Sequence, residues 1–485
     1  MAGHPWQNPT ALLDRTLGEG LERQVAAHHR RRLHDLGWDR ALAPGPGLWA
    51  AGDPPPRPGN SLELLVDGAT ALPRMAEVLM SARSQVSIAG WAFTPEFALT
   101  RSNPPLVLRD VLAELAERMS VRVLLWAGAP LPVFRPWRRQ ARAVRRRLTA
   151  GTKIQVALDN RERPMHTHHE KLILVDGEVA FVGGIDLTDE PVDRYDGSDH
   201  VYRRVNGWHD VASELRGPAV GDVAAHFALR WREVTGEALD VTWPEAAGAV
   251  EAQIVSTIPE HHYTGARDGS FRILEAYLRA IGEARRFIYL ENQFLWSPEI
   301  VAALCDKLLH PPSPDFRLVV LLPSKANSGE DDTQGQLGVL AEADEHGEHF
   351  LACAIHTRSA GLTSAPVYVH AKVGIVDDAW LTLGSANLND HSLFNDTEVN
   401  VVTCDAAFAR AARIRLWSEH LEMAPDQLQG DPVELIDSLW KPIAAEQQER
   451  REAGEAMTHR LARLPHVSKR LRRLLGPLDG MVFDG

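Results

Sequence analysis

One eight-residue pattern occurs twice in this chain. Residues 169–176 read HEKLILVD and residues 370–377 read HAKVGIVD, so each copy has a histidine, a lysine two positions later and an aspartate five positions after the lysine. The second histidine follows the first by 201 residues, which is close to the length of one domain. Two copies at this separation predict a repeated unit of about one domain.

The similarity of the two copies extends beyond the pattern itself. A second apolar segment leads into a turn of small residues in both, AFVGGID at 180–186 and LTLGSAN at 381–387. Gly184 and Ser385 each lie fifteen residues after the histidine of their copy. Because side chains two apart leave the same face of an extended strand, we expect each His and Lys pair at the start of a strand.

Further short segments make the chain similar to a known family. They are YVHAK at 368–372, GSANLND at 384–390, IYLENQF at 288–294, FVGGIDL at 181–187 and WHD at 208–210. Over roughly residues 60–425 the chain resembles the phospholipase D superfamily, whose signature is the duplicated pattern followed by Gly-Gly or Gly-Ser. The flanks look like those of eukaryotic-type and bacterial phospholipases D, with cardiolipin synthases as relatives.

The order of apolar segments predicts an α/β fold, because strands alternate with helical stretches of about ten to fifteen residues. We expect two similar α/β/α sandwich domains with mixed central sheets. The resemblance implies that a pseudo-twofold axis relates them and that the active site lies at their interface. The predicted segments are 1–59 (helix and Pro-rich linker), 60–245 and 246–425 (the two domains) and 426–485 (a helical, partly basic tail), with a polar loop at 325–336.

Cleaving a phosphodiester requires neutralised phosphoryl oxygens, a nucleophile and an acid for the leaving group. Lys171 and Lys372 would neutralise the oxygens, and Ser385 and Asn387 can add neutral donors. One neutral imidazole can attack phosphorus while a protonated imidazole donates to the leaving oxygen.

The resemblance, and not the symmetry of the two copies, assigns the roles within the site. It implies that His169 is the nucleophile and His370 the general acid and base. Each imidazole also needs a partner on its second nitrogen. The resemblance implies Glu398 for one partner and, in the first half, Asp196, with Asp193 as the reserve candidate.

Other residues near these segments receive structural or pocket-lining interpretations. We expect Asp176 and Asp377 to open turns. The segment from Trp208 to Asp210 should lead into a helix core with a capping aspartate. Residues Glu291 to Gln293 should line the pocket at the end of a strand. His391 stands where relatives carry arginine, which leaves that contact open. His166 and His168 are interpreted as solvated or supporting histidines, so we expect no metal and no cofactor.

Composition limits the partners and the compartment. A net charge of −13, from 52 Lys and Arg against 65 Asp and Glu, argues against nucleic acid as the main partner. With no secretory signal and no apolar run of about twenty residues, we expect a cytoplasmic protein that can act peripherally at a membrane. Three scattered cysteines predict buried free thiols. The basic run at 134–147 predicts either a solvated helix face or contact with anionic headgroups. The basic run at 460–475 predicts an amphipathic segment that docks on the domain core or on lipid.

These observations predict an enzyme that cleaves glycerophospholipids at a membrane surface to phosphatidic acid, with water or an alcohol as the acceptor. Three alternatives stay open. The first is a phosphatidyltransferase similar to cardiolipin synthase, and the second is a metal-independent nuclease whose binding would depend strongly on salt. The third is an inactive lipid-binding module, which loss of a turnover on His169→Ala would exclude.

Overall fold

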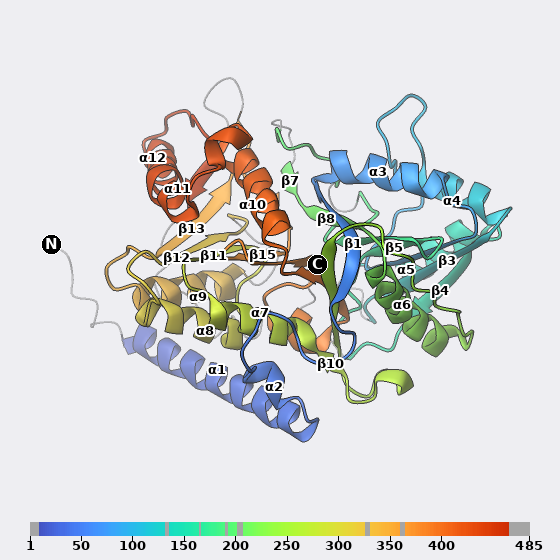
Figure 1. Cartoon of the computed structure of the whole chain (residues 1–485), viewed down its shortest axis with the longest axis horizontal. Helices are drawn as coiled ribbons and strands as arrows, with labels where there is room; N and C mark the ends of the chain where they lie inside the picture. The colour runs from blue at the N-terminus through green and yellow to red at the C-terminus, as the bar shows by residue number, and fades with distance from the viewer. Residues whose placement is uncertain are drawn as a thin grey trace.

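One large mixed β-sheet runs through the residues that the computed structural model describes, which are 9–130, 135–163, 166–189, 193–200, 207–324, 330–358 and 364–464. Two short strands, residues 207–209 and 367–369, pair in parallel as a separate small sheet. Helices cover both faces of the sheet along its length (Figure 1). None of the helices in these ranges is both long enough and apolar enough to cross a bilayer.

The fold has an N-terminal and a C-terminal half, each with strands and the helices between them. The N-terminal half contains β1 (Arg57–Val66), α3 (Gly68–Met80), β2 (Gln85–Gly90), α4 (Leu108–Ala116), β3 (Ser120–Trp126), α5 (Arg138–Thr149), β4 (Gln155–Asp159), β5 (Leu172–Val175), β6 (Val179–Gly183), β7 (Gly207–His209), β8 (Val211–Arg216) and α6 (Ala219–Thr235). The C-terminal half contains β9 (Val250–Ile258), β10 (Ser270–Phe271), α7 (Arg272–Glu283), β11 (Phe287–Glu291), α8 (Pro298–Leu309), β12 (Arg317–Leu321), α9 (Glu330–Ala343), β13 (Phe350–Ile355), β14 (Val367–Val369), β15 (Val373–Val376), β16 (Trp380–Gly384), β17 (Glu398–Thr403) and α10 (Ala406–Leu421). Helices α1 (Pro9–Asp35) and α2 (Asp39–Leu42) precede the halves, and α11 (Pro432–Leu435), α12 (Lys441–Glu452) and β18 (Leu461–Arg463) follow them.

The strand order is the same when read inward from either end. It runs β18-β13-β12-β11-β15-β16-β17-β9-β1-β8-β6-β5-β2-β3-β4, with β10 paired to β9. Three parallel strands stand outermost in each half, apart from β18, and antiparallel strands continue to the centre. There β1 and β9 join the halves as an antiparallel pair.

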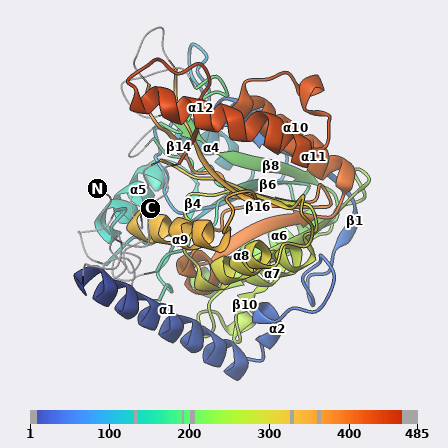
Figure 2. The same ribbon diagram turned by 90° about the vertical axis from the view of Figure 1, so that its left-hand side faces the viewer.

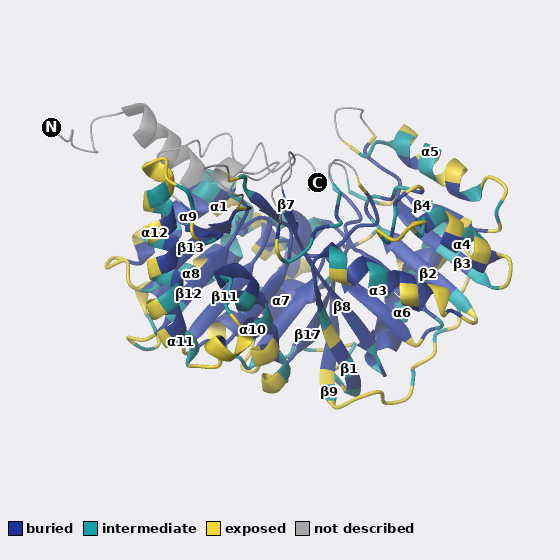
Figure 3. Cartoon of the chain, turned by 90° about the horizontal axis from the view of Figure 1, so that it is seen from above, coloured by how far each residue is buried: buried dark blue, intermediate teal, exposed yellow. Residues whose placement is uncertain are grey.

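Successive side chains of each strand point to opposite faces of the sheet, so they pack alternately against the helices on one face and on the other. In β11, Ile288 and Leu290 belong to the core shared with α7 and α8, whereas Tyr289 packs on Trp417 of α10 and on Trp440 on the opposite face. In the N-terminal half α3 and α4 cover one face and α6 covers the other (Figures 1 and 2). This arrangement buries the strands almost completely, while exposed residues gather on the helices and outer turns (Figure 3).

The aspartate that closes each copy of the repeated pattern has a structural position. Asp176 accepts hydrogen bonds from the backbone N–H groups of Arg83, Ser84 and Gln85. Asp377 accepts in the same way from those of residues 285–287. Both aspartates also adopt left-handed backbone conformations, with φ of 57° and 54°. They fasten the turn after β5 or β15 to the start of a neighbouring strand, at the end away from the histidines.

The structure corrects several predicted boundaries. The predicted loop 325–336 is wrong from residue 330 onward, because α9 starts there and its Leu337 and Leu340 pack into the core; residues 325–329 lie outside the described part of the chain. The predicted linker already enters β1 at Arg57. The part of the tail at 465–475 also lies outside the described residues. Of the three free cysteines, Cys353 alone is fully buried.

The N-terminal helix is fastened to the C-terminal half. Arg32 on α1 forms an ion pair of 2.6 Å with Glu260, and His29 contacts Glu299 on α8 at 2.8 Å. Polar contacts between such distant parts of the sequence could not be paired from the sequence, because helical periodicity reports only which face is buried.

Candidate functional site

The two histidines of the repeated pattern line one cavity. Its volume is about 620 Å³, and its wall includes His169, His370 and the aromatic side chains of Trp91, Trp126 and Trp208. His169 and His370 precede β5 and β15 directly and do not belong to those strands, contrary to the prediction. Their side chains are buried and reach solvent only through the cavity.

A glutamate from the C-terminal half orients His169. The Nδ1 atom of His169 lies 2.9 Å from Oε1 of Glu398, and the backbone N–H of His169 donates to the carbonyl of Thr397. Ser385 and Ser392 each donate a hydroxyl hydrogen bond of 2.5 Å to the same carboxylate. Burial raises the pKa of Glu398, and the nearby His169 and Lys171 oppose this only in part.

An aspartate from the N-terminal half orients His370. Its Nδ1 lies 2.7 Å from Oδ2 of Asp210, and its backbone N–H donates to the carbonyl of His209. Burial alone would raise the pKa of Asp210, but His370 and Lys372 outweigh burial and hold that pKa at about 2. Burial, Lys372 and Arg194 lower the pKa of His370.

Strand register shows that Asp210 and Glu398 occupy equivalent positions. Gly183 of β6 pairs with Ala212 of β8, and Gly384 of β16 pairs with Asn400 of β17. Each carboxylate comes two residues before the paired residue. Each half therefore supplies the carboxylate for the histidine of the other half.

Asp196, predicted as a partner of a site histidine, does not have that role. It accepts hydrogen bonds from the backbone N–H groups of Trp208 and Gly197, and its carboxylate faces His200 at 3.3 Å. The reserve candidate Asp193 forms an ion pair with Arg101. The carboxylate that orients His370 belongs to the residue directly before β8. The predicted helix core that follows is present as α6, but among the described residues no side chain caps its first turn. An acidic residue at or directly before the start of an apolar strand was the signal in the sequence.

The repeated turn gives the two carboxylates different neighbours. A side chain at Gly184 would overlap Oδ1 of Asp210, so the absence of a Cβ at this position admits the carboxylate. At the equivalent position Ser385 has a side chain, and its hydroxyl donates to Glu398. The difference between Gly-Gly and Gly-Ser therefore follows from the shape of the carboxylate each turn accommodates.

The two lysines lie beside their histidines, as predicted. Lys171 donates to the carbonyl of His169 at 2.7 Å and lies 3.3 Å from Asp186. Lys372 donates to the carbonyl of His370 at 2.6 Å and to Oε1 of Gln293 at 3.1 Å.

Amide side chains and one arginine complete the cavity wall. Asn387, a predicted donor, contacts Oε1 of Gln293 at 3.3 Å, and Gln293 lines the cavity. Arg194 also lines it, with its guanidinium 3.6 Å from the centre of the Trp208 ring. Burial lowers the pKa of Arg194. Its place in the cavity was missed in the sequence, because it precedes the segment of irregular backbone around Asp196.

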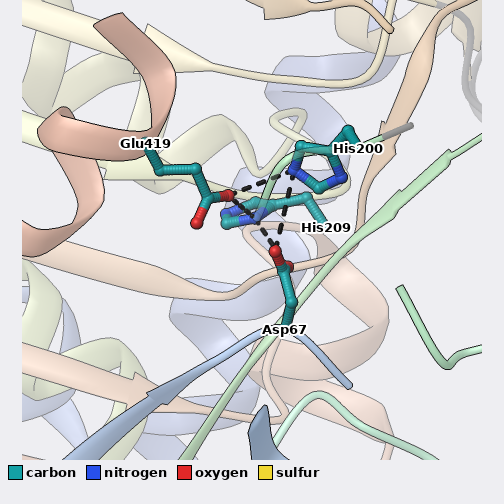
Figure 4. Close-up of side chains that lie close together, drawn as sticks. All are labelled: Asp67, His200, His209 and Glu419. Atoms are coloured by element: carbon teal, nitrogen blue, oxygen red, sulfur yellow. Dashed lines mark hydrogen bonds and ion pairs between the residues drawn. The ribbon is translucent and has the colours of Figure 1, made fainter. Parts of the chain in front are cut away.

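Asp67, His200, His209 and Glu419 form a buried network of charged side chains (Figure 4). Asp210 adjoins this network, because its backbone N–H donates to Asp67 at 3.1 Å. Nδ1 of His209 is 3.0 Å from both Asp67 and Glu419, and its Nε2 is 3.0 Å from Glu291. His200 contacts Glu419 at 3.1 Å. Burial would lower the pKa of both imidazoles, but the carboxylates, Asp67 first, outweigh it. They raise the pKa of His209 well above its ordinary value and that of His200 to about 9.

Four groups of side chains in the described ranges have the spacing that a metal ion could use. They are Asp67, His200, His209 and Glu419; His166, His391 and Asp396; His209, Glu291 and His420; and His29, Glu299 and Asp390. In the first group the pKa values of His200 and His209 are raised, which favours their protonated forms. The imidazolium groups can then neutralise the carboxylates of Asp67 and Glu419. His391, the departure noted in the sequence, lies 2.8 Å from His166, and His168 is buried against Asp159 at 3.2 Å and is not solvated.

Comparison with known proteins agrees with this geometry. The family model described as cardiolipin synthase, PLD-like domain, matches residues 277–418. Phospholipase D A of Dictyostelium discoideum is 26% identical over 468 aligned residues, which cover 76% of this chain and 36% of that protein. Phospholipase D2 of Bos taurus is 24% identical, with 72% of this chain and 50% of that protein covered. The chain thus spans between a third and a half of the length of these two relatives.

The fold matches a solved structure as well. Phosphatidylserine synthase of Haemophilus influenzae Rd KW20 superimposes with a TM-score of 0.51 at 11% identity, covering 81% of this chain and 93% of that one. The match supports an α/β fold with a large mixed sheet, as in that solved structure. In sequence the chain resembles members of the phospholipase D superfamily, as a distant relative.

Proposed function

We propose that the protein is a phospholipase D-type enzyme that cleaves glycerophospholipids to phosphatidic acid and a free headgroup through a phosphohistidine. The observation that carries this proposal is the pair of histidines in one cavity, each backed by a carboxylate from the other half. The mirrored strand order supports two copies of one α/β/α unit related by a pseudo-twofold axis, with the active site between them. The lipid substrate is inferred from the relatives, which match this chain over part of their length.

The unequal carboxylates support the assignment of roles. Asp210, with its low pKa, is a full negative charge that can stabilise an imidazolium on His370. Glu398, with its raised pKa, stabilises a charge on His169 less strongly, which favours a neutral nucleophile. The cations that lower the pKa of His370 in the empty cavity would be offset by the anionic phosphodiester.

The reaction then has two steps. Nε2 of His169 forms a bond to phosphorus as the P–O bond to the headgroup breaks, and His370 gives its proton to the leaving oxygen. In the second step neutral His370 takes a proton from water, whose oxygen attacks phosphorus and releases His169. Lys171 and Lys372 balance the charge on the phosphoryl oxygens. An alcohol in place of water would give phosphatidyl transfer.

A second candidate is a phosphatidyltransferase that joins two phosphatidylglycerol molecules. One observation favours it: the family model that matches residues 277–418 is described by cardiolipin synthase. The chemistry would be the same, and the acceptor alcohol alone would differ.

Turnover of phosphatidylcholine and phosphatidylglycerol vesicles in EDTA, with and without ethanol, tests both candidates. We expect the unsubstituted protein to release phosphatidic acid, diverted to phosphatidylethanol by ethanol, and His169→Ala to abolish turnover. His310→Ala, which removes an exposed imidazole remote from the cavity, is the matched control and should retain activity. Cardiolipin as the main product would support the transferase, and turnover of neither lipid would refute the phospholipid assignment.

A further inference from the structure

Helix α5 exposes a line of arginines. Arg139, Arg142 and Arg146 are solvent-exposed and follow one another at spacings of three and four residues, so they share one face of the helix. The opposite face carries Ala141 and Leu148, which are buried. These three arginines are called the arginine face below.

The charges of the arginine face are not neutralised by the described part of the chain. Two other arginines of α5 are paired, Arg138 with Glu162 and Arg147 with Glu96. Within the described ranges, none of the three arginines of the face forms an ion pair with an acidic side chain. The protein as a whole has a net charge of −13, so this concentration of positive charge opposes the general balance.

The arginine face adjoins a side of α5 that lines the cavity with the two histidines. Gln140, Val144 and Arg147, on the adjoining side of α5, line the same cavity as His169 and His370. The helix stands at the outer edge of the N-terminal half with exposed residues along it (Figure 3). An anionic surface bound to the arginine face would therefore lie beside the entrance through which substrate reaches the histidines.

The neighbouring cavity wall indicates which kind of anionic surface fits. Trp91, Phe93 and Trp126 give that wall an aromatic, largely apolar character. A molecule that enters here beside a cluster of guanidinium groups should combine an anionic group with an apolar part. A phospholipid surface has both, and arginines near such a surface gain attraction from each anionic headgroup.

We propose that the arginine face docks the protein on anionic phospholipid bilayers and so holds the cavity mouth at the lipid surface. That docking brings the cavity to its substrate rests on the proposed function. Docking itself can be measured without turnover, so the two ideas can fail separately.

The test is co-sedimentation with vesicles of phosphatidylcholine alone and of phosphatidylcholine mixed with phosphatidylglycerol. All proteins carry His169→Ala, so the vesicles are not consumed. The test variant adds Arg139→Gln, Arg142→Gln and Arg146→Gln. The control variant instead adds Arg83→Gln, Arg118→Gln and Arg285→Gln, which remove the same charge. These three exposed arginines precede β2, β3 and β11. The cavity-lining Trp91 follows β2 and Trp126 is the last residue of β3, so the control changes the edge of the sheet away from the cavity.

We expect the parent to bind the anionic vesicles, the test variant to bind them at least about tenfold more weakly, and the control to bind like the parent. Binding by the parent should also weaken as salt is raised, which provides a measure independent of how the variants fold. Equal binding by test and control variants would overturn the proposal. Stronger binding of the parent to a DNA or RNA oligonucleotide than to the vesicles, lost in the test variant, would also overturn it and assign the face to nucleic acid.

Discussion

The carboxylate behind His169 and the carboxylate behind His370 occupy equivalent strand positions but have different surroundings. Glu398 receives two hydroxyl hydrogen bonds from Ser385 and Ser392, and burial raises its pKa. Asp210 is placed against a glycine, and His370 and Lys372 keep its pKa at about 2. Burial raises the pKa of both carboxylates, and nearby imidazole, ammonium and donor groups lower it; these groups outweigh burial at Asp210 but not at Glu398. One backbone plan can therefore support two histidines with different proton affinities.

The largest effect should come from Asp210→Asn. Removing the full negative charge would leave His370 unable to stabilise its proton, and the amide can impose the wrong tautomer on the ring. We expect kcat to fall by about a thousandfold, with the loss nearly independent of pH because the pKa of Asp210 lies far below the assay range. Steady-state kinetics on vesicles between pH 5 and 8 would measure this loss of kcat. That pH interval is chosen because it spans the ordinary pKa of histidine, about 6.5. A loss under about tenfold would contradict the different roles of the two carboxylates.

Gly184→Ala should disturb Asp210 by steric overlap and leave Glu398 of the other half unchanged. Because the added Cβ would overlap Oδ1 of Asp210, the carboxylate must move away from His370. We expect a loss of unfolding free energy of about 2–3 kcal/mol together with a large fall in kcat.

The matched change in the other half is Ser385→Ala, which removes one donor to Glu398 and should cost about 1 kcal/mol. Urea denaturation gives both values. If the serine variant were the more damaged of the two, the steric account of the Gly-Gly turn would be wrong.

The charged network that adjoins Asp210 should make stability depend on alkaline pH. The pKa of His200 is about 9 in the folded protein and about 6.5 when unfolded, so its stabilising charge is fully present below pH 6.5. That stabilisation is lost as pH rises through about 9. We expect the unfolding free energy to decrease by about 2–3 kcal/mol over this interval.

The control for this effect is His200→Asn, which removes the titrating group and should flatten the slope above pH 6.5. Urea titrations at a series of pH values would show the difference. An unchanged slope in the variant would mean that the neighbouring His209 or another group carries the alkaline loss.

Glu398→Gln should have the smallest catalytic effect. Since the pKa of Glu398 is raised, its neutral form is more accessible than that of Asp210, and an amide resembles it. We expect a reduction in kcat of about tenfold at neutral pH that shrinks as pH falls and the native glutamate takes up its proton. A reduction that matches that of Asp210→Asn at every pH would remove the distinction between the two carboxylates.

The sequence predicted the α/β fold and most of the candidate site, because both depend on local patterns. The repeated HxKxxxxD pattern singled out His169, Lys171, His370 and Lys372. The two histidines line one cavity, and each lysine donates to the carbonyl of its own histidine. Asp210 was missed because its role depends on pairing between β6 and β8 and on contact across the halves. Neither can be read from periodicity, since a period shows which face is buried and not what it contacts.

The same limit explains the other corrections. Helix α9 begins at Glu330 inside a stretch of polar residues, and its later turns are stabilised by Leu337 and Leu340 in the core. Arg194 enters the cavity from an irregular segment that carries no repeating pattern. Tertiary contacts decided each of these features, and they involve residues far apart in the chain.

The crossing of carboxylates between the halves also bears on how such a chain could be divided. If the chain were cut between α6 and β9 and only one piece were produced, that piece would contain a histidine without its carboxylate and a carboxylate without its histidine. Neither fragment would hold a single correctly oriented imidazole. Fragment complementation in this protein would therefore restore both histidine–carboxylate pairs together. If the proposed function holds, recovery of activity would report reassociation of the two pieces directly.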